Sequence, residues 1–215
     1  SEASAGSDAR ALRATWTRDG DQRVLAGTKK WVTNGRIAGL VVAFIREEPE
    51  GRISAFLLDA DRHEFQVGKR EVTMGLAASE TVELILDGAR LDEDALLGEE
   101  GQGFRYAMEA LAIGRVGIAC QAIGIARAAF EHARDYASER VQFDRALSEF
   151  QATRFKLAEM ATRVTRARCL ALAAAEALEG KSDPEGPSPE VMAAMAKVSA
   201  SENAVWTTDE AVQIF

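Results

Sequence analysis

The stretch Leu97-Gly98-Glu99-Glu100-Gly101-Gln102-Gly103-Phe104 marks the point at which the chain changes character. Before it, apolar and polar side chains alternate, as they do in half-buried β-strands. After it, apolar residues recur with a period of about 3.6, as on an α-helix. The stretch is rich in glycine but lacks the Lys-Ser/Thr pair of a phosphate-binding loop. We therefore expect a linker followed by a helix start, and we predict a multidomain α+β fold.

The first 98 residues have the composition of a small β-domain. Turn residues separate the candidate strands at the spacing of about 8–12 positions that is typical of antiparallel sandwiches and barrels. The sequence therefore predicts an antiparallel β-sandwich or barrel over residues 1–98. The candidate strands are 12–17, 23–25, 40–45, 53–58, 63–67 and 81–86.

Residues 99–215 are predicted to form an α-helical domain of the four-helix-bundle type. A second helix at 149–178 carries a seven-residue apolar seam, which indicates a near-antiparallel partner. Ser188 and Pro189 have the pattern of an N-cap and first turn for a third helix that runs to the last residue. We expect the domain to be incomplete, with apolar helical faces that meet missing segments or other subunits. The first helix carries one apolar stripe of Phe104, Met108, Leu111, Ile118, Ala122, Ile125, Ala129 and Ala133, and a second of Val116, Ile123 and Phe130.

Composition excludes several classes of protein. Lys plus Arg is 26 and Asp plus Glu is 34, so the net charge of −8 disfavours a nucleic-acid-binding protein. The absence of a long uncharged apolar run and of a signal-peptide pattern predicts an intracellular protein without a membrane span. Cys120 and Cys169 are expected to be reduced thiols in the helical core. His63 and His132 lack partners at catalytic or metal-ligand spacing, so no metal site is predicted.

Two segments in the β-rich half offer groups that could bind a ligand. In Ala5-Gly6-Ser7-Asp8, glycine permits close backbone approach and the next two residues offer polar groups, although the same pattern also describes a capped turn. In Trp31-Val32-Thr33-Asn34-Gly35, the indole and the Thr33 hydroxyl share one strand face, which suits a planar heterocycle. The simpler interpretation is a core tryptophan before an Asn-Gly turn.

Two further segments lie in the helical half. In Glu139-Arg140-Val141-Gln142-Phe143, an arginine and an aromatic ring leave a helix end, where they could bind a diphosphate and stack on adenine. Equally, the arginine could interact with the dipole at the helix C-terminus and the aromatic ring could pack in the core. Ser148 and Gln151 have capping-box spacing, which would explain Gln151 without a ligand.

Taken in order, these segments resemble the acyl-CoA dehydrogenase family of flavoproteins. The resemblance covers essentially the whole chain and implies the middle β-domain and most of a C-terminal four-helix domain. The matching segments are Ser1-Glu2 through Asp8, 25–35, Thr73-Met74-Gly75, 97–104, 139–143, 157–160 and 209–215.

The resemblance implies FAD as cofactor, held between the two domains with its flavin against the β-domain. It places Ser7 and Arg115 at the acyl-CoA. It also implies a homotetramer, built as a dimer of dimers, in which one subunit reaches the adenosine diphosphate of its neighbour's FAD. The residues it assigns to the flavin are Ser1, Ser7, Trp31, Val32 and Thr33, and those it assigns to the adenosine diphosphate are Arg140, Gln142, Phe143, Gln151 and Gln213.

The reaction implied is α,β-dehydrogenation of an acyl-CoA thioester in fatty acid β-oxidation, with electrons passed to an electron-transferring flavoprotein. The compartment would be the bacterial cytoplasm or, in a eukaryote, the mitochondrial matrix. A carboxylate base removes the α-proton, and family members place it either downstream of residue 215 or at the position of Gly114. Glu109 lies elsewhere on that helix, so no catalytic residue is assigned within 1–215.

Three departures from the family pattern affect this interpretation. Ala112 stands where relatives often have Asp, Asp144 replaces a Gly and brings a carboxylate near the expected diphosphate, and Ala3 replaces a Pro. Two alternatives therefore stay open: an acyl-CoA oxidase or flavin monooxygenase of the same superfamily, and a non-catalytic partner subunit of a heteromeric dehydrogenase.

Overall fold

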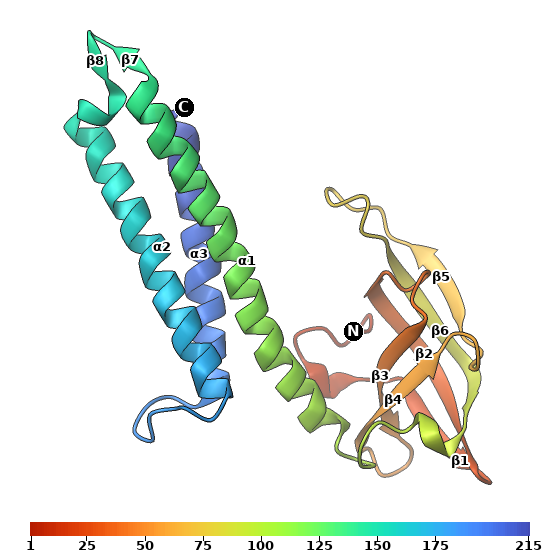
Figure 1. Cartoon of the computed structure of the whole chain (residues 1–215). Coiled ribbons are helices and arrows are strands. Elements are labelled where there is room, and N and C mark those ends of the chain that lie inside the picture. The colour runs from red at the N-terminus through yellow and green to blue at the C-terminus, as the bar shows by residue number, and fades with distance from the viewer. The chain divides into compact units, whose positions relative to one another are not determined.

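The computed structural model describes all residues from Ser1 to Phe215 and divides them into two compact units, Ser1–Met108 and Glu109–Phe215. The first unit contains a β-sheet and the second contains helices (Figure 1). The predicted α+β class, with a β-domain followed by a helical one, is confirmed. The boundary expected between residues 98 and 99 stays a prediction.

The first unit is built on one six-stranded sheet of order β4-β3-β1-β2-β6-β5. Neighbouring strands are antiparallel except β1 and β3, which are parallel and pair Thr15 with Arg46. The strands are β1 (Thr15–Asp19), β2 (Gln22–Thr33), β3 (Leu40–Glu47), β4 (Ile53–Asp59), β5 (Gln66–Arg70) and β6 (Thr81–Leu91).

Four strands differ from their predicted ranges by three residues or more at one end at least. Strand β1 begins at Thr15 rather than at residue 12, and β6 continues to Leu91 rather than ending at residue 86. Strand β2 continues to Thr33 because its ladder with β6 continues that far, a long-range pairing that local alternation does not reveal. The strand expected at 63–67 begins instead at Gln66. His63 belongs to the preceding turn, where its Nδ1 accepts the N–H of Asp59 at 2.9 Å.

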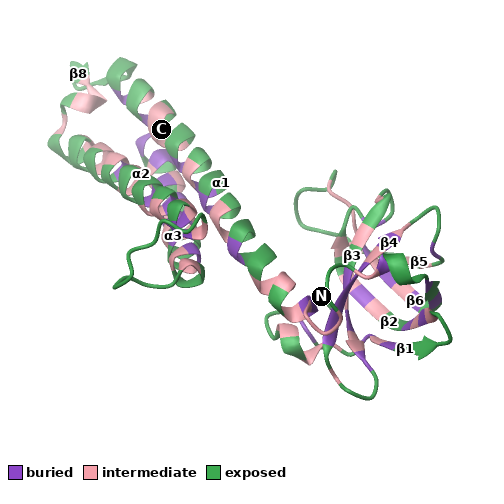
Figure 2. Cartoon of the chain, turned by 60° about the horizontal axis from the view of Figure 1, so that its bottom comes forward, coloured by how far each residue is buried: buried purple, intermediate pink, exposed green.

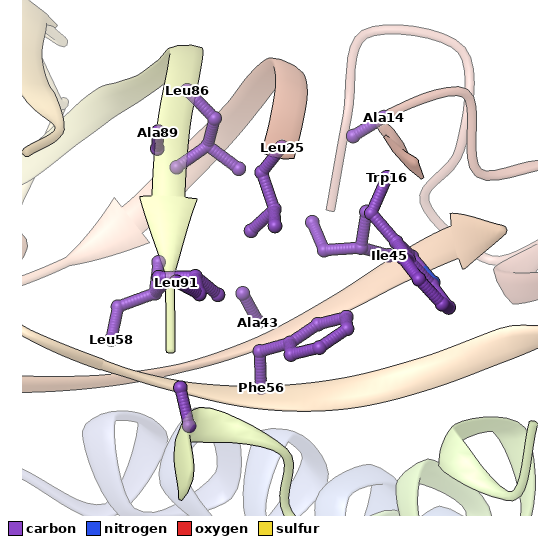
Figure 3. Close-up of a cluster of buried hydrophobic side chains, with 11 residues drawn as sticks. Ala14, Trp16, Leu25, Ala43, Ile45, Phe56, Leu58, Leu86, Ala89 and Leu91 are labelled. Atoms are coloured by element: carbon purple, nitrogen blue, oxygen red, sulfur yellow. The ribbon is translucent and has the colours of Figure 1, made fainter. Parts of the chain in front are cut away.

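The core of this unit is a cluster of buried side chains from five strands (Figure 3). Trp16 and Phe56 meet edge to face within it, with ring centroids 5.7 Å apart. Both are almost fully buried. The other members are Ala14, Leu25, Ala43, Ile45, Leu58, Leu86, Ala89, Leu91 and Ala95.

The glycine-rich stretch is a linker and helix start, as predicted. The N–H of Leu97 donates to the carbonyl of Ala55, and that of Gly101 donates to Oγ of Ser54. Helix α1 begins at Gly103, where an added Cβ would lie 2.5 Å from the carbonyl carbon of Ser54. The first residue of the helix therefore packs directly on β4, and glycine is required there.

The second unit contains most of α1 (Gly103–Glu139), together with α2 (Gln151–Leu178) and α3 (Pro189–Ile214). The N-cap prediction at Ser188 is confirmed, since its Oγ accepts the N–H of Val191. Helices α2 and α3 lie side by side (Figure 1). The predicted seam of α2 is buried at Met160, Ala167 and Ala174.

One apolar stripe predicted for α1 leaves its large residues exposed in this chain, where the sequence predicted helical faces that meet missing segments or other subunits. Leu111, Ile118 and Ile125 are 47%, 48% and 52% exposed, whereas alanines occupy the buried side (Figure 2). Small side chains on this side let neighbouring helices approach closely, because the distance between packed helices depends on the residues at the contact. The second predicted stripe, Val116, Ile123 and Phe130, does pack on the core. The buried alanines are Ala112, Ala119, Ala122, Ala126, Ala133 and Ala137.

The prediction of buried thiols is also wrong, because Cys120 and Cys169 are both exposed and free. Neither cysteine belongs to the buried cluster of the helical unit, although Ala119 and Ala171 close to them in the chain are buried there. Helix α1 is long and apolar enough to cross a membrane by length and composition alone, a criterion that the core helix of a soluble protein also meets. The expectation of no membrane span stays a prediction.

Candidate functional site

Trp31 lies at a β-bulge near the end of β2. Lys29 pairs with Leu84 and Val32 pairs with Val82, so Lys30 and Trp31 together oppose Glu83. Trp31 has a φ of +58° and an indole that is 51% exposed. The simpler interpretation of a core tryptophan is therefore excluded. Bulges re-aim side chains and are common beside functional sites.

The structure brings Ser1 to this bulge. The carbonyl of Ser1 accepts the N–H of Lys30 at 2.9 Å, which places the start of the chain beside Trp31. Thr33 follows two residues later, exposed and opposite Thr81, while Val32 is half-buried. Ser1, Trp31 and Thr33, predicted separately from the sequence, thus lie along one short stretch of the sheet.

Ser7 lies in the same N-terminal loop and is exposed without a side-chain hydrogen bond. The next residue, Asp8, accepts the N–H of Arg10 and caps the 3₁₀ turn at Ala9–Ala11. The capped-turn interpretation therefore accounts for Asp8 but leaves the hydroxyl of Ser7 available to a ligand.

Sequence reasoning missed a buried ion pair beneath this loop. Lys29 Nζ donates to the Glu2 carboxylate at 2.6 Å, and both side chains are less than a tenth exposed. Burial would raise the pKa of Glu2, but the hydrogen bonds from Lys29, Arg13 and Ala14 outweigh it and the pKa is lowered. Burial lowers the pKa of Lys29, partly offset by Glu2. A lysine at an inward position of an alternating strand was the signal available in the sequence.

A second group of predicted residues lies at the hairpin of β7 (Val141–Gln142) and β8 (Arg145–Ala146). The two turn residues, Phe143 and Asp144, have φ of +52° and +62°, as in a type I′ turn. Glycine tolerates this conformation best, so Asp144 stands at a position that favours glycine. The ring of Phe143 is 88% exposed.

Polar groups around the hairpin lack partners. The side chains of Arg140 and Gln142 are exposed and make no hydrogen bond or ion pair. Asp144 pairs with neither Arg140 nor Arg145, and the guanidinium of Arg145 instead covers the ring of Phe150 at 3.8 Å. The carboxylate of Asp144 therefore has no compensating charge contact within this chain.

The capping-box explanation of Gln151 is wrong. Phe150 is the N-cap of α2 and makes no side-chain capping bond, and Ser148 belongs to the 3₁₀ turn Leu147–Glu149. This turn ends before α2 begins, so the spacing does not mark a cap. The exposed amide of Gln151 is thereby left without a partner, as is that of Gln213 in the last turn of α3.

The remaining predicted positions lie early in α1. Arg115 is half-buried without an ion pair, and Ala112 is buried. Gly114 is exposed, and an added Cβ would meet nothing within 4 Å. The first unit also has a cavity of about 280 Å³, which none of the predicted site residues lines. Its lining is Arg10, Arg46, Gly51, Ile53 and Phe104.

Two family models cover nearly all of the chain. "Acyl-CoA dehydrogenase, middle domain" matches residues 1–89, and "Acyl-CoA dehydrogenase, C-terminal domain" matches residues 101–215. This chain belongs to the acyl-CoA dehydrogenase family. The resemblance inferred from the ordered motifs is confirmed, and relatives named as acyl-CoA dehydrogenases match the whole of the chain.

Curated relatives of this family member come from bacteria and mitochondria. An acyl-CoA dehydrogenase of Bacillus subtilis is 46% identical over 100% of this chain and 56% of its own length. The mitochondrial short-chain specific acyl-CoA dehydrogenase of Bos taurus is 44% identical over 100% of this chain and 52% of its own. The chain thus spans about half the length of the curated relatives it matches.

Solved structures of the family agree in fold. Butyryl-CoA dehydrogenase from Megasphaera elsdenii has a TM-score of 0.89 and 40% identity, over 100% of this chain and 56% of its own. A chain in a structure described as the electron transferring flavoprotein of Acidaminococcus fermentans has a TM-score of 0.88 and 43% identity, over the same shares.

Proposed function

We propose that the whole protein catalyses FAD-dependent α,β-dehydrogenation of an acyl-CoA thioester. This chain spans about half the length of its relatives. One observation carries the proposal. In a member of this family, an exposed indole at a strained bulge lies beside Ser1 and Thr33, so that a flat aromatic surface and hydroxyl donors are available together.

The residues of the first unit fit a flavin. Trp31 offers a flat face at a positive φ, and backbone strain of this kind persists mainly at functional sites. Ser1, Val32 and Thr33 would contact the ring beside it, and Ser7 would lie where flavin and acyl-CoA meet. FAD supplies the acceptor for the hydride from the β-carbon. The Thr33 hydroxyl would stabilise negative charge on the reduced ring by donating a hydrogen bond.

The second unit offers groups suited to an adenosine diphosphate. Arg140 presents forked donors without an intramolecular partner, and the exposed ring of Phe143 can stack on a base. The amides of Gln142, Gln151 and Gln213 are likewise unpartnered. We infer that these five residues hold the FAD of a neighbouring subunit in a homotetramer.

For the substrate, Ser7 and Arg115 are the binding residues of this chain. No carboxylate stands at Gly114, so the base that removes the α-proton lies outside residues 1–215. The short-chain and butyryl-CoA relatives favour a short acyl thioester. Electron-transferring flavoprotein is the proposed acceptor, in the bacterial cytoplasm or the mitochondrial matrix, and the neighbouring structure described by that name supports it.

The test is to express the full-length protein, record its visible absorbance and add a panel of acyl-CoA thioesters without oxygen. A flavin spectrum that bleaches with a short-chain thioester is expected. A protein that carries no flavin and bleaches with no thioester would refute the proposal.

A second candidate is a non-catalytic partner subunit that lends Arg140 and Phe143 to the FAD of a sister chain. The unpaired carboxylate of Asp144 and the apolar Ala112 beside an unpaired Arg115 favour it. This candidate predicts that the purified full-length protein holds FAD only when mixed with a second, related chain.

A further inference from the structure

The buried ion pair between Glu2 and Lys29 lies at the root of the N-terminal loop. Lys29 Nζ donates to the Glu2 carboxylate and to the carbonyl of Phe44, both at 2.6 Å. The Glu2 side chain is 5% exposed and the Lys29 side chain is 9% exposed. Charges so deeply buried persist only where they are paired and fully hydrogen-bonded, and such pairs can specify one arrangement of the backbone.

The Glu2 carboxylate also ties together both ends of the loop. It accepts the N–H of Arg13 at 2.6 Å and that of Ala14 at 3.2 Å. The backbone of Glu2 exchanges two hydrogen bonds with Ala5, which closes the first turn. Residues 1–14 are therefore held as one closed loop that carries Ser1 and Ser7.

On the strand side, Lys29 is the last residue before the bulge. The next residue, Lys30, donates its N–H to the carbonyl of Ser1. The ion pair and this backbone hydrogen bond therefore hold the N-terminal loop at two adjacent residues of β2. The position of Ser1 relative to Trp31 consequently depends on the ion pair and on the hydrogen bond together. The side chain of Lys30 itself forms an ion pair with Glu83 and none with Glu2.

We propose that the Glu2–Lys29 pair is a positioning device that holds the serines of the loop in register with Trp31 and Thr33. It thereby sets the geometry of the flavin face. This inference rests on the proposed function, and both charged side chains are buried beneath the loop.

The test uses the full-length protein with Lys29→Met and Glu2→Gln. We expect each variant to raise the FAD dissociation constant about tenfold or more, since each breaks a buried pair, and to change the visible circular dichroism of bound flavin. In the apoprotein, amide hydrogen exchange should accelerate at Arg13, Ala14 and Lys30, the three N–H groups that depend on this arrangement.

Two controls separate positioning from stability. Lys30→Met removes the surface pair with Glu83 and should leave FAD affinity and the flavin dichroism unchanged. Leu58→Ala opens a cavity in the core and should lower the melting temperature without changing the flavin dichroism below it. Wild-type affinity and dichroism in both pair variants would overturn the inference. If the wild-type protein holds no FAD, the proposed function fails instead, and unchanged exchange at the three amides then overturns the positioning role as well.

Discussion

Trp31 combines two features that a core tryptophan would not have, a positive φ and an indole that is half exposed. Both cost free energy, because a bulky residue rarely adopts this backbone conformation and apolar surface remains in water. Trp16 on β1, by contrast, is a core tryptophan. At the scale of the residue, packing within this chain does not explain Trp31, whereas the proposed flavin site would.

Replacing Trp31 by asparagine tests this explanation. Asparagine tolerates a positive φ, so the apoprotein should be as stable as the wild type or more so. Loss of the aromatic face should weaken FAD binding by about 1–3 kcal/mol, the range found for stacking of a base on an aromatic side chain. Melting temperature and FAD titration of the full-length protein measure the two effects. Unchanged FAD affinity would contradict a stacking role.

Glu2 predicts a pH dependence of stability. Its pKa lies below the ordinary value of 4.5, so the stabilisation is complete above that pH and is lost as the pH falls through the lowered pKa. The difference in free energy of unfolding between the wild type and Glu2→Gln should therefore shrink below about pH 4.5. Denaturant titrations at several pH values measure it. A difference that stays constant as the pH falls would refute the assignment.

At the scale of the element, the β7–β8 hairpin shows a conflict between turn geometry and charge. Phe143 and Asp144 occupy left-handed positions that asparagine and glycine fill more readily. The carboxylate of Asp144 remains unpaired beside the proposed diphosphate site. Its conformational and electrostatic effects can be separated by substitution.

Asp144→Asn removes the charge and keeps a side chain that accepts the left-handed conformation. We expect it to bind FAD several-fold more tightly at low salt, and the gain should decline as salt screens the repulsion. Asp144→Gly should also raise the free energy of unfolding by about 0.5–1 kcal/mol, because glycine adopts the left-handed conformation without strain. FAD titrations at two ionic strengths distinguish the effects. A gain that does not depend on salt would contradict the electrostatic explanation.

The start of α1 depends on Gly103. Alanine there would place its Cβ 2.5 Å from the backbone of Ser54, so helix or strand must shift. We expect Gly103→Ala to destabilise the full-length protein by about 1–3 kcal/mol, measured by thermal unfolding. Gly75→Ala meets no atom within 4 Å and serves as the neutral control. Equal stability of the two variants would show that the close packing is not required.

At the scale of the whole molecule, each unit has its own buried core, yet the helical unit leaves large apolar side chains exposed. On α3 they recur at Val191, Val198, Val205 and Val212, a seven-residue repeat. Exposed apolar stripes of this kind mark surfaces that contact other chains or other parts of the protein. They agree with the proposed homotetramer.

Ile118→Glu tests that proposal. A carboxylate on the exposed apolar side of α1 would be buried without a partner on assembly, so the full-length protein should dissociate into smaller species. Light scattering after size-exclusion chromatography measures the mass. Gln121→Glu, at an exposed polar position of the same helix, should not change it. An unaltered mass for Ile118→Glu would place this face outside the subunit interface.

Local signals predicted most of the elements. The helix start after Gly101, the N-cap at Ser188 and the seam of α2 are each encoded within a few residues, because capping and helical periodicity are local properties. The sequence also singled out Trp31 and Thr33, on the expectation that both lie on one face of a regular strand, whereas Trp31 lies at a bulge with a positive φ. The assignments of all these residues to FAD stay predictions.

Other features required the assembled fold. The bulge at Trp31 exists because β2 pairs with β6, more than forty residues away, with one extra residue on its side. The buried side of α1 is the side on which alanines contact the partner helices. The two apolar stripes in the sequence did not show which side of the helix this would be. The capping box at Gln151 failed because a separate 3₁₀ turn precedes α2.

The amino-acid sequence by itself determined the fold class, the family and the order of the elements, since these follow from periodicity, capping and ordered motifs. Tertiary structure alone decided that the loop of residues 1–14 meets the bulge of β2 and that Glu2 pairs with Lys29. The physical reason is that burial, strand register and ion pairing join residues far apart in the chain, and their partners are defined only when the chain is folded.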